Sequence, residues 1–127
     1  MTDDTPRPVL FLKAGCPHCL KVRLFLLEAR LADRVEQRQF TPGDAAEAGI
    51  REELAERVAK VSFPAMRFAG DEYVTESDVI IGRLAELFGV SPAALPVFST
   101  YAGTVLPRYT AARREAAELK KRLGEAG

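Results

Sequence analysis

The sequence predicts one α/β domain built on a four-stranded mixed sheet, followed by a helical segment at the C-terminus. In the first half of the chain, short apolar runs typical of strands alternate with apolar residues at helical spacing. Two further strand-like runs then flank the turn dipeptide Gly70-Asp71, which indicates an antiparallel hairpin. A chain of 127 residues can form one domain with a substantial core.

The first strand is expected at residues 9–12, a continuous apolar run that suits a strand buried on both faces. A helix follows from Pro17 to about Ala32, because proline favours the first helical turn and four leucines recur at helical spacing. These leucines are Leu20, Leu24, Leu27 and Leu31. A second, more polar strand is expected at residues 35–40.

Asp44 and Glu47 resemble a capping box, which predicts that a second helix begins there. Its buried face is expected to carry Ile50, Leu54, Val58 and Val61. Residues 64–69 and 72–75 form the hairpin strands, and a third helical stripe ends at Gly89, a typical C-cap. That stripe comprises Ile80, Leu84, Leu87 and Phe88.

The C-terminal segment is expected to form one long helix that begins near Ser91-Pro92 and bends at Pro107. Its apolar stripe includes Phe98, Tyr101 and Tyr109, which are more commonly core residues than a substrate surface. The predicted organisation is a flexible N-terminal tail at residues 1–7, the α/β domain at residues 8–89 and the helical extension at residues 90–127.

Charge and composition exclude several classes of partner. The chain carries 18 basic and 18 acidic residues, so its zero net charge favours neither nucleic acid nor an anionic membrane as partner. The N-terminus shows no secretory leader, and no apolar run is long enough to span a membrane. We therefore expect a cytoplasmic protein, in which two cysteines are more often catalytic or metal-binding than a structural disulfide.

The candidate active site is Cys16-Pro17-His18-Cys19, directly after a strand and at the start of a helix. The helix N-terminus favours an anion, which predicts a lowered pKa for Cys16 and assigns it the role of nucleophile. Cys19 lies one helical turn further on and is the candidate resolving thiol. A protonated His18 would further stabilise the Cys16 thiolate and make the disulfide more oxidising.

A metal site is the rival interpretation of the two cysteines. Zinc usually takes four ligands, but the chain holds two cysteines and one histidine, which lies within the motif. A closed zinc site in one chain would have to recruit carboxylates, so redox chemistry is the favoured interpretation.

Four motifs resemble those of known families. Residues 13–19, Lys-Ala-Gly-Cys-Pro-His-Cys, resemble the active-site segment of glutaredoxins, and residues 19–24 resemble the first helix of glutathione transferase N-terminal domains. Ser62-Phe63-Pro64 resembles the cis-proline loop of the thioredoxin superfamily, and Glu76-Ser77 resembles the pair with which transferases hold the γ-glutamyl group. The resemblance covers residues 8–89 and implies a thioredoxin-like βαβαββα fold.

The resemblance also implies a glutathione site. Lys13 would face the glycine carboxylate, and Phe63, before Pro64, would offer its backbone to the cysteinyl part. The γ-glutamyl group would lie at a helix N-terminus, a natural place for a carboxylate. The residues expected there are Ser77 together with Asp78, as in glutaredoxins, or Glu76, as in transferases.

Two departures from these families bear on function. Glutaredoxins more often have tyrosine at the position of His18. A histidine at this position resembles the motif of strongly oxidising periplasmic enzymes. In transferases, a large helical domain supplies the pocket for the electrophile. The segment at residues 90–127 is too short to form such a domain, so conjugation to foreign electrophiles is not expected.

Each residue implied by the resemblance also has a purely structural interpretation. Lys13 can be a solvated charge at a strand end, Ser77 and Asp78 can cap a helix, and Pro64 can open an edge strand in the trans form.

The predicted function is therefore glutathione-dependent reduction of disulfides or of protein–glutathione mixed disulfides, with glutathione as co-substrate and such proteins as partners. Three alternatives stay open: transfer of glutathione to a small molecule, an iron–sulfur cluster held by Cys16 and glutathione between two chains, and a partner-binding module. In the last, residues 98–123 would form a docking surface or a homodimer contact through the C-terminal helix.

Overall fold

A computed structural model describes residues 7–126 of the chain, so the tail predicted at residues 1–7 lies outside the described residues apart from Arg7. The elements follow one another in the predicted order, with the C-terminal segment divided into several helical pieces. They are β1 (Val9–Lys13), α1 (Pro17–Glu28), the 3-10 turn η1 (Ala32–Arg34), β2 (Glu36–Phe40), α2 (Glu47–Ala55), β3 (Ala65–Phe68), β4 (Glu72–Thr75), α3 (Ser77–Phe88), the 3-10 turn η2 (Pro92–Ala94), α4 (Pro96–Thr100), the π-helical turn η3 (Tyr101–Val105) and α5 (Leu106–Ala126).

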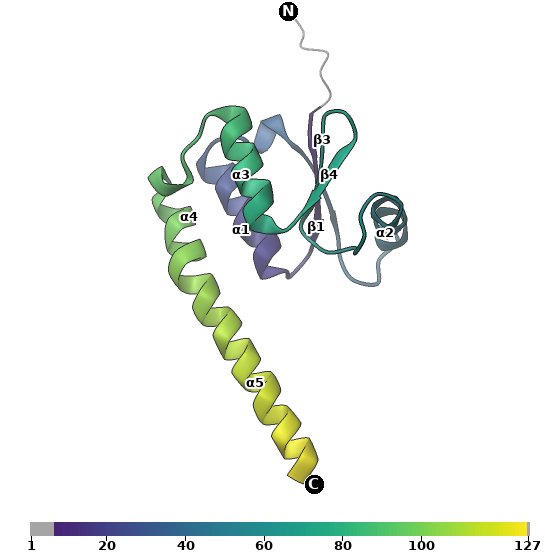
Figure 1. The fold of residues 1–127 in the computed structure, drawn as a ribbon, viewed down its shortest axis with the longest axis vertical. Helices are drawn as coiled ribbons and strands as arrows, with labels where there is room; N and C mark the ends of the chain where they lie inside the picture. The colour runs from purple at the N-terminus through teal and green to yellow at the C-terminus, as the bar shows by residue number, and fades with distance from the viewer. Residues whose placement is uncertain (1–6, 127) are drawn as a thin grey trace, which may run out of the picture.

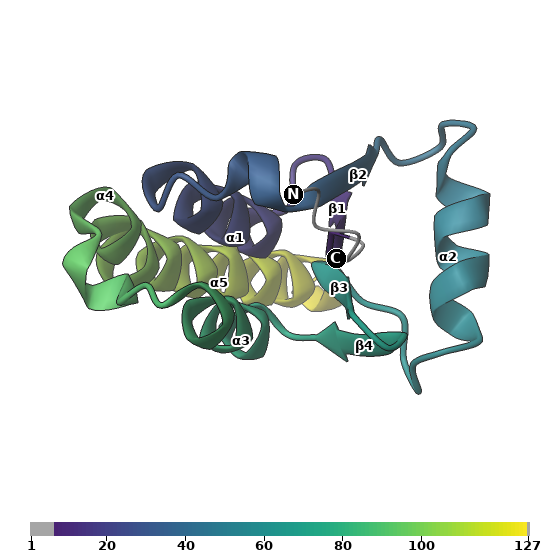
Figure 2. The same ribbon diagram turned by 90° about the horizontal axis from the view of Figure 1, so that it is seen from above.

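The four strands form one mixed sheet in the order β2-β1-β3-β4. Strands β1 and β2 are parallel, whereas β3 pairs antiparallel with both β1 and β4. Helices α1 and α3 cover one face of the sheet and α2 covers the other, as seen along the sheet in Figure 2. This architecture confirms the predicted thioredoxin-like α/β fold with a C-terminal helical extension.

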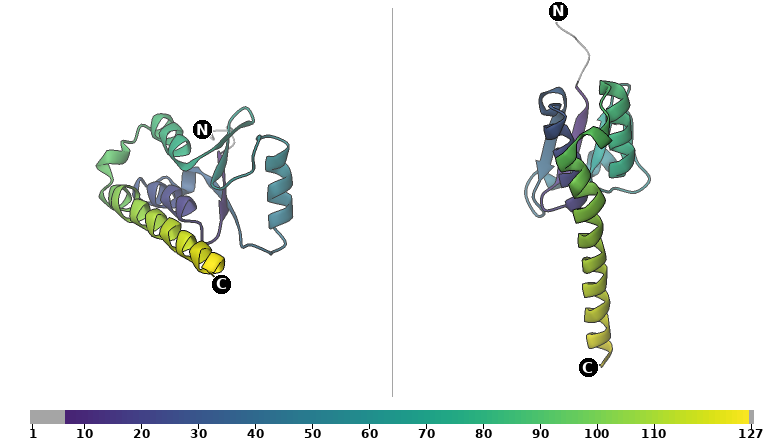
Figure 3. Two further views of the ribbon diagram at one scale, coloured as in Figure 1. Left: turned by 60° about the horizontal axis from the view of Figure 1, so that its bottom comes forward. Right: turned by 90° about the vertical axis from the view of Figure 1, so that its left-hand side faces the viewer.

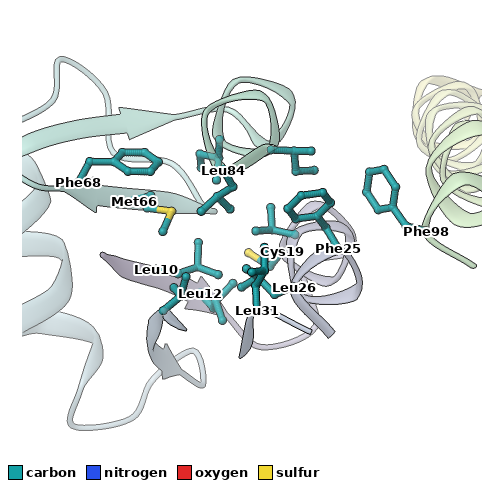
Figure 4. Packing of buried hydrophobic residues seen from close by; sticks show 14 residues of the cluster. Leu10, Leu12, Cys19, Phe25, Leu26, Leu31, Met66, Phe68, Leu84 and Phe98 are labelled. Atoms are coloured by element: carbon teal, nitrogen blue, oxygen red, sulfur yellow. The ribbon is translucent and has the colours of Figure 1, made fainter. Parts of the chain in front are cut away.

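Strand β1 is buried on both faces, as its continuous apolar run predicts. Leu10 and Leu12 belong to the larger core beneath α1 and α3, whereas Val9 and Phe11 belong to the smaller core beneath α2. The larger core is drawn in Figure 4, where Cys19 packs among leucine and phenylalanine side chains. The cysteine motif therefore directly follows the carboxyl end of a strand that is packed on both faces.

Helix α1 buries a different face from the one its leucines predict. Val22, Phe25 and Leu26 are fully buried, whereas Leu20 and Leu27 are exposed. The helix also ends earlier, at Glu28, because Arg30 takes a left-handed conformation with φ of 62°. Leu20 and Leu27 were thus wrong choices for the core stripe, whereas Leu31 is buried in the core as predicted. Phe25 instead packs in this core and against Phe98 of α4.

The remaining turns follow the sequence signals closely. The Asp44 carboxylate accepts hydrogen bonds from the backbone N–H groups of Ala46 and Glu47, but α2 begins at Glu47 with Ala46 as its N-cap, so Asp44 lies before the helix and not at its cap. Gly70 and Asp71 both have positive φ in the hairpin turn, and Gly89 closes α3 in the left-handed conformation. Val58 and Val61, expected within the second helix, follow its end and still pack on the smaller core.

The C-terminal segment runs along α1 and then continues away from the domain (Figures 1 and 3). The C-terminal segment is not the single long α-helix that was predicted, because the π-helical turn η3 interrupts it just before α5, in which Pro107 is the second residue. A proline lacks the N–H for a normal helical hydrogen bond and crowds the carbonyl four residues earlier, and a wider turn accommodates both effects. Beyond Thr110 the described helix is exposed, including Leu119 and Leu123.

No helix in the described part of the chain combines the length and the apolar character needed to cross a membrane.

Candidate active site

Cys16 is the N-cap residue of α1. Its backbone is extended, with φ of −90° and ψ of 119°, and Pro17 occupies the first helical position. The backbone N–H of Cys19 donates to Cys16 Sγ at 3.4 Å. The sulfur therefore takes the place of the side-chain oxygen that usually caps a helix, where unpaired N–H groups favour a negative charge.

The pKa of the Cys16 thiol is lowered to about 5. The largest cause is the hydrogen bond from the Cys19 thiol, followed by the backbone N–H groups of Cys19 and His18 and by the charge of His18, whereas partial burial opposes the shift. The charge of the exposed His18 also lowers the pKa of Cys16, but it contributes less than the Cys19 thiol does.

Cys19 is the buried partner, with 2% of its surface exposed. Sharing its proton with Cys16 and burial in the core both raise the pKa of the Cys19 thiol. The backbone N–H of Lys13 also donates to Cys19 Sγ at 3.5 Å. The two thiols are free and chemically distinct: Cys16 is half-buried and has a lowered pKa, whereas Cys19 is buried and has a raised pKa.

We expect iodoacetamide to alkylate Cys16 first, with a rate that rises to half its maximum near pH 5, because the thiolate is the reactive form and the pKa of Cys16 is about 5. Cys19 should stay unmodified at neutral pH. Quenched reactions across a pH series, analysed by peptide mass, measure both rates. Earlier modification of Cys19 would reverse the assigned roles.

The loop before β3 lies against Cys16. The Phe63–Pro64 peptide is cis, as the resemblance to the cis-proline loop implies. In its thiol form, Cys16 Sγ donates to the Phe63 carbonyl oxygen at 3.8 Å. The Phe63 ring packs edge-on against Phe40 with centroids 4.9 Å apart, and the Arg51 guanidinium lies 5.3 Å from its centroid. These contacts fix the loop whose backbone faces the nucleophile.

A pocket of about 330 Å³ lies beside the cysteine motif and collects most of the predicted site. It is lined by His18, Ser62, Phe63, Pro64, Glu76, Ser77 and Asp78. Glu76 has φ of 75° and its exposed side chain makes no capping hydrogen bond to α3. Ser77 and Asp78 open that helix, so α3 points its N-terminal N–H groups toward this pocket.

Lys13 lies on the other side of Cys16. It lines a second pocket of about 370 Å³, whose walls also include Cys16, Pro17 and Cys19 and residues of the C-terminal helical segment. The other lining residues include Leu20, Arg23, Gln39, Tyr101, Val105 and Tyr109. The structure thus brings eight of the nine predicted site residues to the motif and the first pocket, whereas Lys13 adjoins the motif but lines the second pocket.

Sequence reasoning missed the contribution of Tyr101. Its hydroxyl donates to the Pro17 carbonyl oxygen at 2.7 Å, which ties η3 to the first turn of α1. Burial, with a smaller effect from the charge of Cys16, raises the pKa of Tyr101 and keeps this donor protonated. Phe98, from the same predicted stripe, is indeed core and packs edge-on against Phe25 at 5.6 Å. The predicted stripe therefore contributes Phe98 to the core and Tyr101 to the site.

Sequence reasoning also missed Lys21, which is buried between α1 and α3. Its ammonium donates to Ser77 Oγ at 3.3 Å and forms an ion pair with Asp78. No local sequence signal marks Lys21, because a lysine on an amphipathic helix is ordinarily solvated.

The model of the glutathione S-transferase N-terminal domain family matches residues 10–92. A glutathione S-transferase from the Antarctic clam Laternula elliptica is 25% identical with a TM-score of 0.54, over 68% of this chain and 37% of the clam protein. Glutaredoxin 2 from Salmonella typhimurium, solved in complex with glutathione, is 19% identical with a TM-score of 0.53, over 69% of this chain and 37% of its own.

Glutathione transferase Omega 3C from Trametes versicolor shares the fold at 15% identity and a TM-score of 0.53, over 66% of this chain and 34% of its own. The chain therefore spans 34% to 37% of the length of these three structures. None of the curated proteins matches it. The family model covers more than half of the chain and the fold agrees with it, so the chain belongs to the glutathione S-transferase N-terminal domain family of the thioredoxin superfamily.

Proposed function

We propose that the chain is a glutathione-dependent thiol–disulfide oxidoreductase of the glutaredoxin type. The observation that carries this proposal is the pair of unlike thiols, in which Cys16 has a pKa of about 5 and Cys19 is buried one helical turn away. A thiolate at neutral pH attacks disulfides, and a nearby second thiol can resolve the product. A reducing cytoplasm is the compartment that suits this chemistry.

Glutathione fits the polar groups on both sides of Cys16. Its γ-glutamyl end would occupy the first pocket near Ser77 and Asp78, and its cysteinyl backbone would face the Phe63 carbonyl and amide. The glycine carboxylate would then extend toward Lys13, across the nucleophile. Membership of a glutathione transferase family supports this ligand, and so does the glutathione complex of the Salmonella glutaredoxin.

The proposed reaction consists of two thiol–disulfide exchanges. The Cys16 thiolate attacks the glutathione sulfur of a protein–glutathione mixed disulfide, so that a bond forms from Cys16 to glutathione and the protein leaves as a thiolate. A second glutathione thiolate then attacks the glutathione sulfur on Cys16 and releases glutathione disulfide. Free glutathione is the reductant: in sum, the mixed disulfide and one glutathione thiolate give the protein thiolate and glutathione disulfide, and Cys16 returns to its thiolate.

A disulfide within a protein substrate requires Cys19. Attack of Cys16 leaves the substrate covalently linked through one of its sulfurs. The Cys19 thiol then displaces that sulfur, which forms the Cys16–Cys19 disulfide and releases a fully reduced substrate. Two glutathione molecules reduce this disulfide and restore the dithiol.

The direct experiment measures glutathione disulfide formed from a glutathionylated peptide with glutathione as the sole reductant. We expect saturable catalysis well above the uncatalysed exchange, with one glutathione disulfide released per peptide thiol. A separate sample of the same protein is tested for alkylation of Cys16 by iodoacetamide at low pH. If Cys16 reacts there but glutathione disulfide forms only at the uncatalysed rate, the proposed function is contradicted while the assignment of the thiolate stays intact.

A further inference from the structure

A buried lysine lies behind the first pocket. Lys21 on α1 has a side chain that is 10% exposed, and it is buried together with Ser77. Lysine is rarely buried without a partner, because an ammonium loses its hydration on burial. The Lys21 ammonium offsets this loss by a hydrogen bond to Ser77 and an ion pair with Asp78, both in the first turn of α3.

The contact with Lys21 makes the Ser77 hydroxyl oxygen a hydrogen-bond acceptor. An ammonium carries only donors, so Ser77 Oγ accepts from Lys21 at 3.3 Å. The serine hydroxyl proton is therefore free for another acceptor. With the unpaired N–H groups of the α3 N-terminus beside it, this corner of the pocket offers donors to a carboxylate.

The contact with Asp78 has the opposite consequence. Lys21 pairs with one carboxylate oxygen, Oδ1, whereas 86% of the Asp78 side chain is exposed. The rest of the carboxylate can thus accept hydrogen bonds from a cation next to Ser77. Lys21 holds a donor for a carboxylate and an acceptor for an ammonium side by side, which is the pattern that recognises the head of an α-amino acid.

We propose that Lys21 is the positioning residue that makes this pocket selective for thiols with a γ-glutamyl arm. The inference rests on the proposed function, in which glutathione is the thiol. Lys21 touches neither substrate nor the reacting sulfur, since its polar contacts are with Ser77 and Asp78. It acts by orienting these two side chains toward the free α-amino acid end of glutathione.

The test compares two mixed disulfides of one peptide, the first with glutathione and the second with cysteinylglycine, which lacks the γ-glutamyl arm. The reduced protein reacts with each under single-turnover conditions, and mass analysis of quenched samples gives second-order rate constants. Lys21→Met should slow transfer from the glutathione substrate by about tenfold, the scale of one hydrogen bond to a charged group, and leave the cysteinylglycine substrate unchanged.

Two further variants complete the experiment. Lys21→Arg should restore most of the preference, because it keeps a charged donor, and Lys120→Met on the exposed part of α5 should change neither rate. An unchanged preference in Lys21→Met, or an equal loss with both substrates, would overturn the inference and leave Lys21 a structural residue. A wild-type protein that does not distinguish the two substrates would overturn the glutathione site itself, and the role of Lys21 with it.

Discussion

Cys16→Ser should abolish reduction of both glutathionylated peptides and protein disulfides, by at least about three orders of magnitude. A serine hydroxyl is not ionised at neutral pH and cannot form a disulfide, whereas the pKa of the Cys16 thiol is about 5. The measurement is the rate of glutathione disulfide formation for wild-type and variant protein at pH 7.

The fold should survive this substitution, because Cys16 is only partly buried and serine is a good N-cap residue. Circular dichroism and thermal unfolding provide that control. Residual activity above a few per cent of wild type would show that another group is the nucleophile, and would remove the basis for the roles of both cysteines.

Cys19→Ser should separate the two activities. Turnover of glutathionylated peptides should stay within about a factor of three, because a second glutathione can discharge Cys16 directly. Reduction of a protein disulfide such as that of insulin should fall by about a hundredfold or more, since it depends on an intramolecular thiol at high effective concentration. Parallel assays of the two substrates measure the ratio.

The pKa of Cys16 must be followed in the same variant. The hydrogen bond from the Cys19 thiol is the largest cause of the lowered pKa, so its replacement by a serine hydroxyl changes the pKa of the Cys16 thiol and the rate of alkylation at low pH. Assays at pH 8 reduce this effect and isolate the loss of the resolving thiol. Equal loss of both activities at pH 8 would show that the route with a single thiol does not operate.

The fold could be predicted from the sequence because each element has a strong local signal. The run at residues 9–12, the proline at the start of α1, and the Gly70-Asp71 and Gly89 turns all act over a few residues. The cysteine motif could be found for the same reason, since its chemistry depends on one helix N-terminus. The chosen face of α1 was wrong because periodicity cannot tell which of two adjacent apolar stripes meets the sheet.

The remaining site residues depend on contacts between distant parts of the chain. Lys21 meets partners 56 and 57 positions further on, and a lysine in an amphipathic helix is ordinarily solvated. Tyr101 contacts the Pro17 carbonyl 84 positions away and is the first residue of the π-helical turn η3. Neither contact has a local signature, so only the tertiary structure reveals them.

The most direct test of the central claim, that Cys16 is a thiolate that exchanges glutathione, is to trap the covalent product. Cys19→Ser protein is mixed with a glutathionylated peptide at pH 7, and its cysteine peptides are identified by mass. We expect one glutathione on Cys16, formed as the peptide thiol appears and removed again by free glutathione. Absence of this adduct while the variant still turns over the peptide, or an adduct that glutathione does not discharge, would contradict the claim.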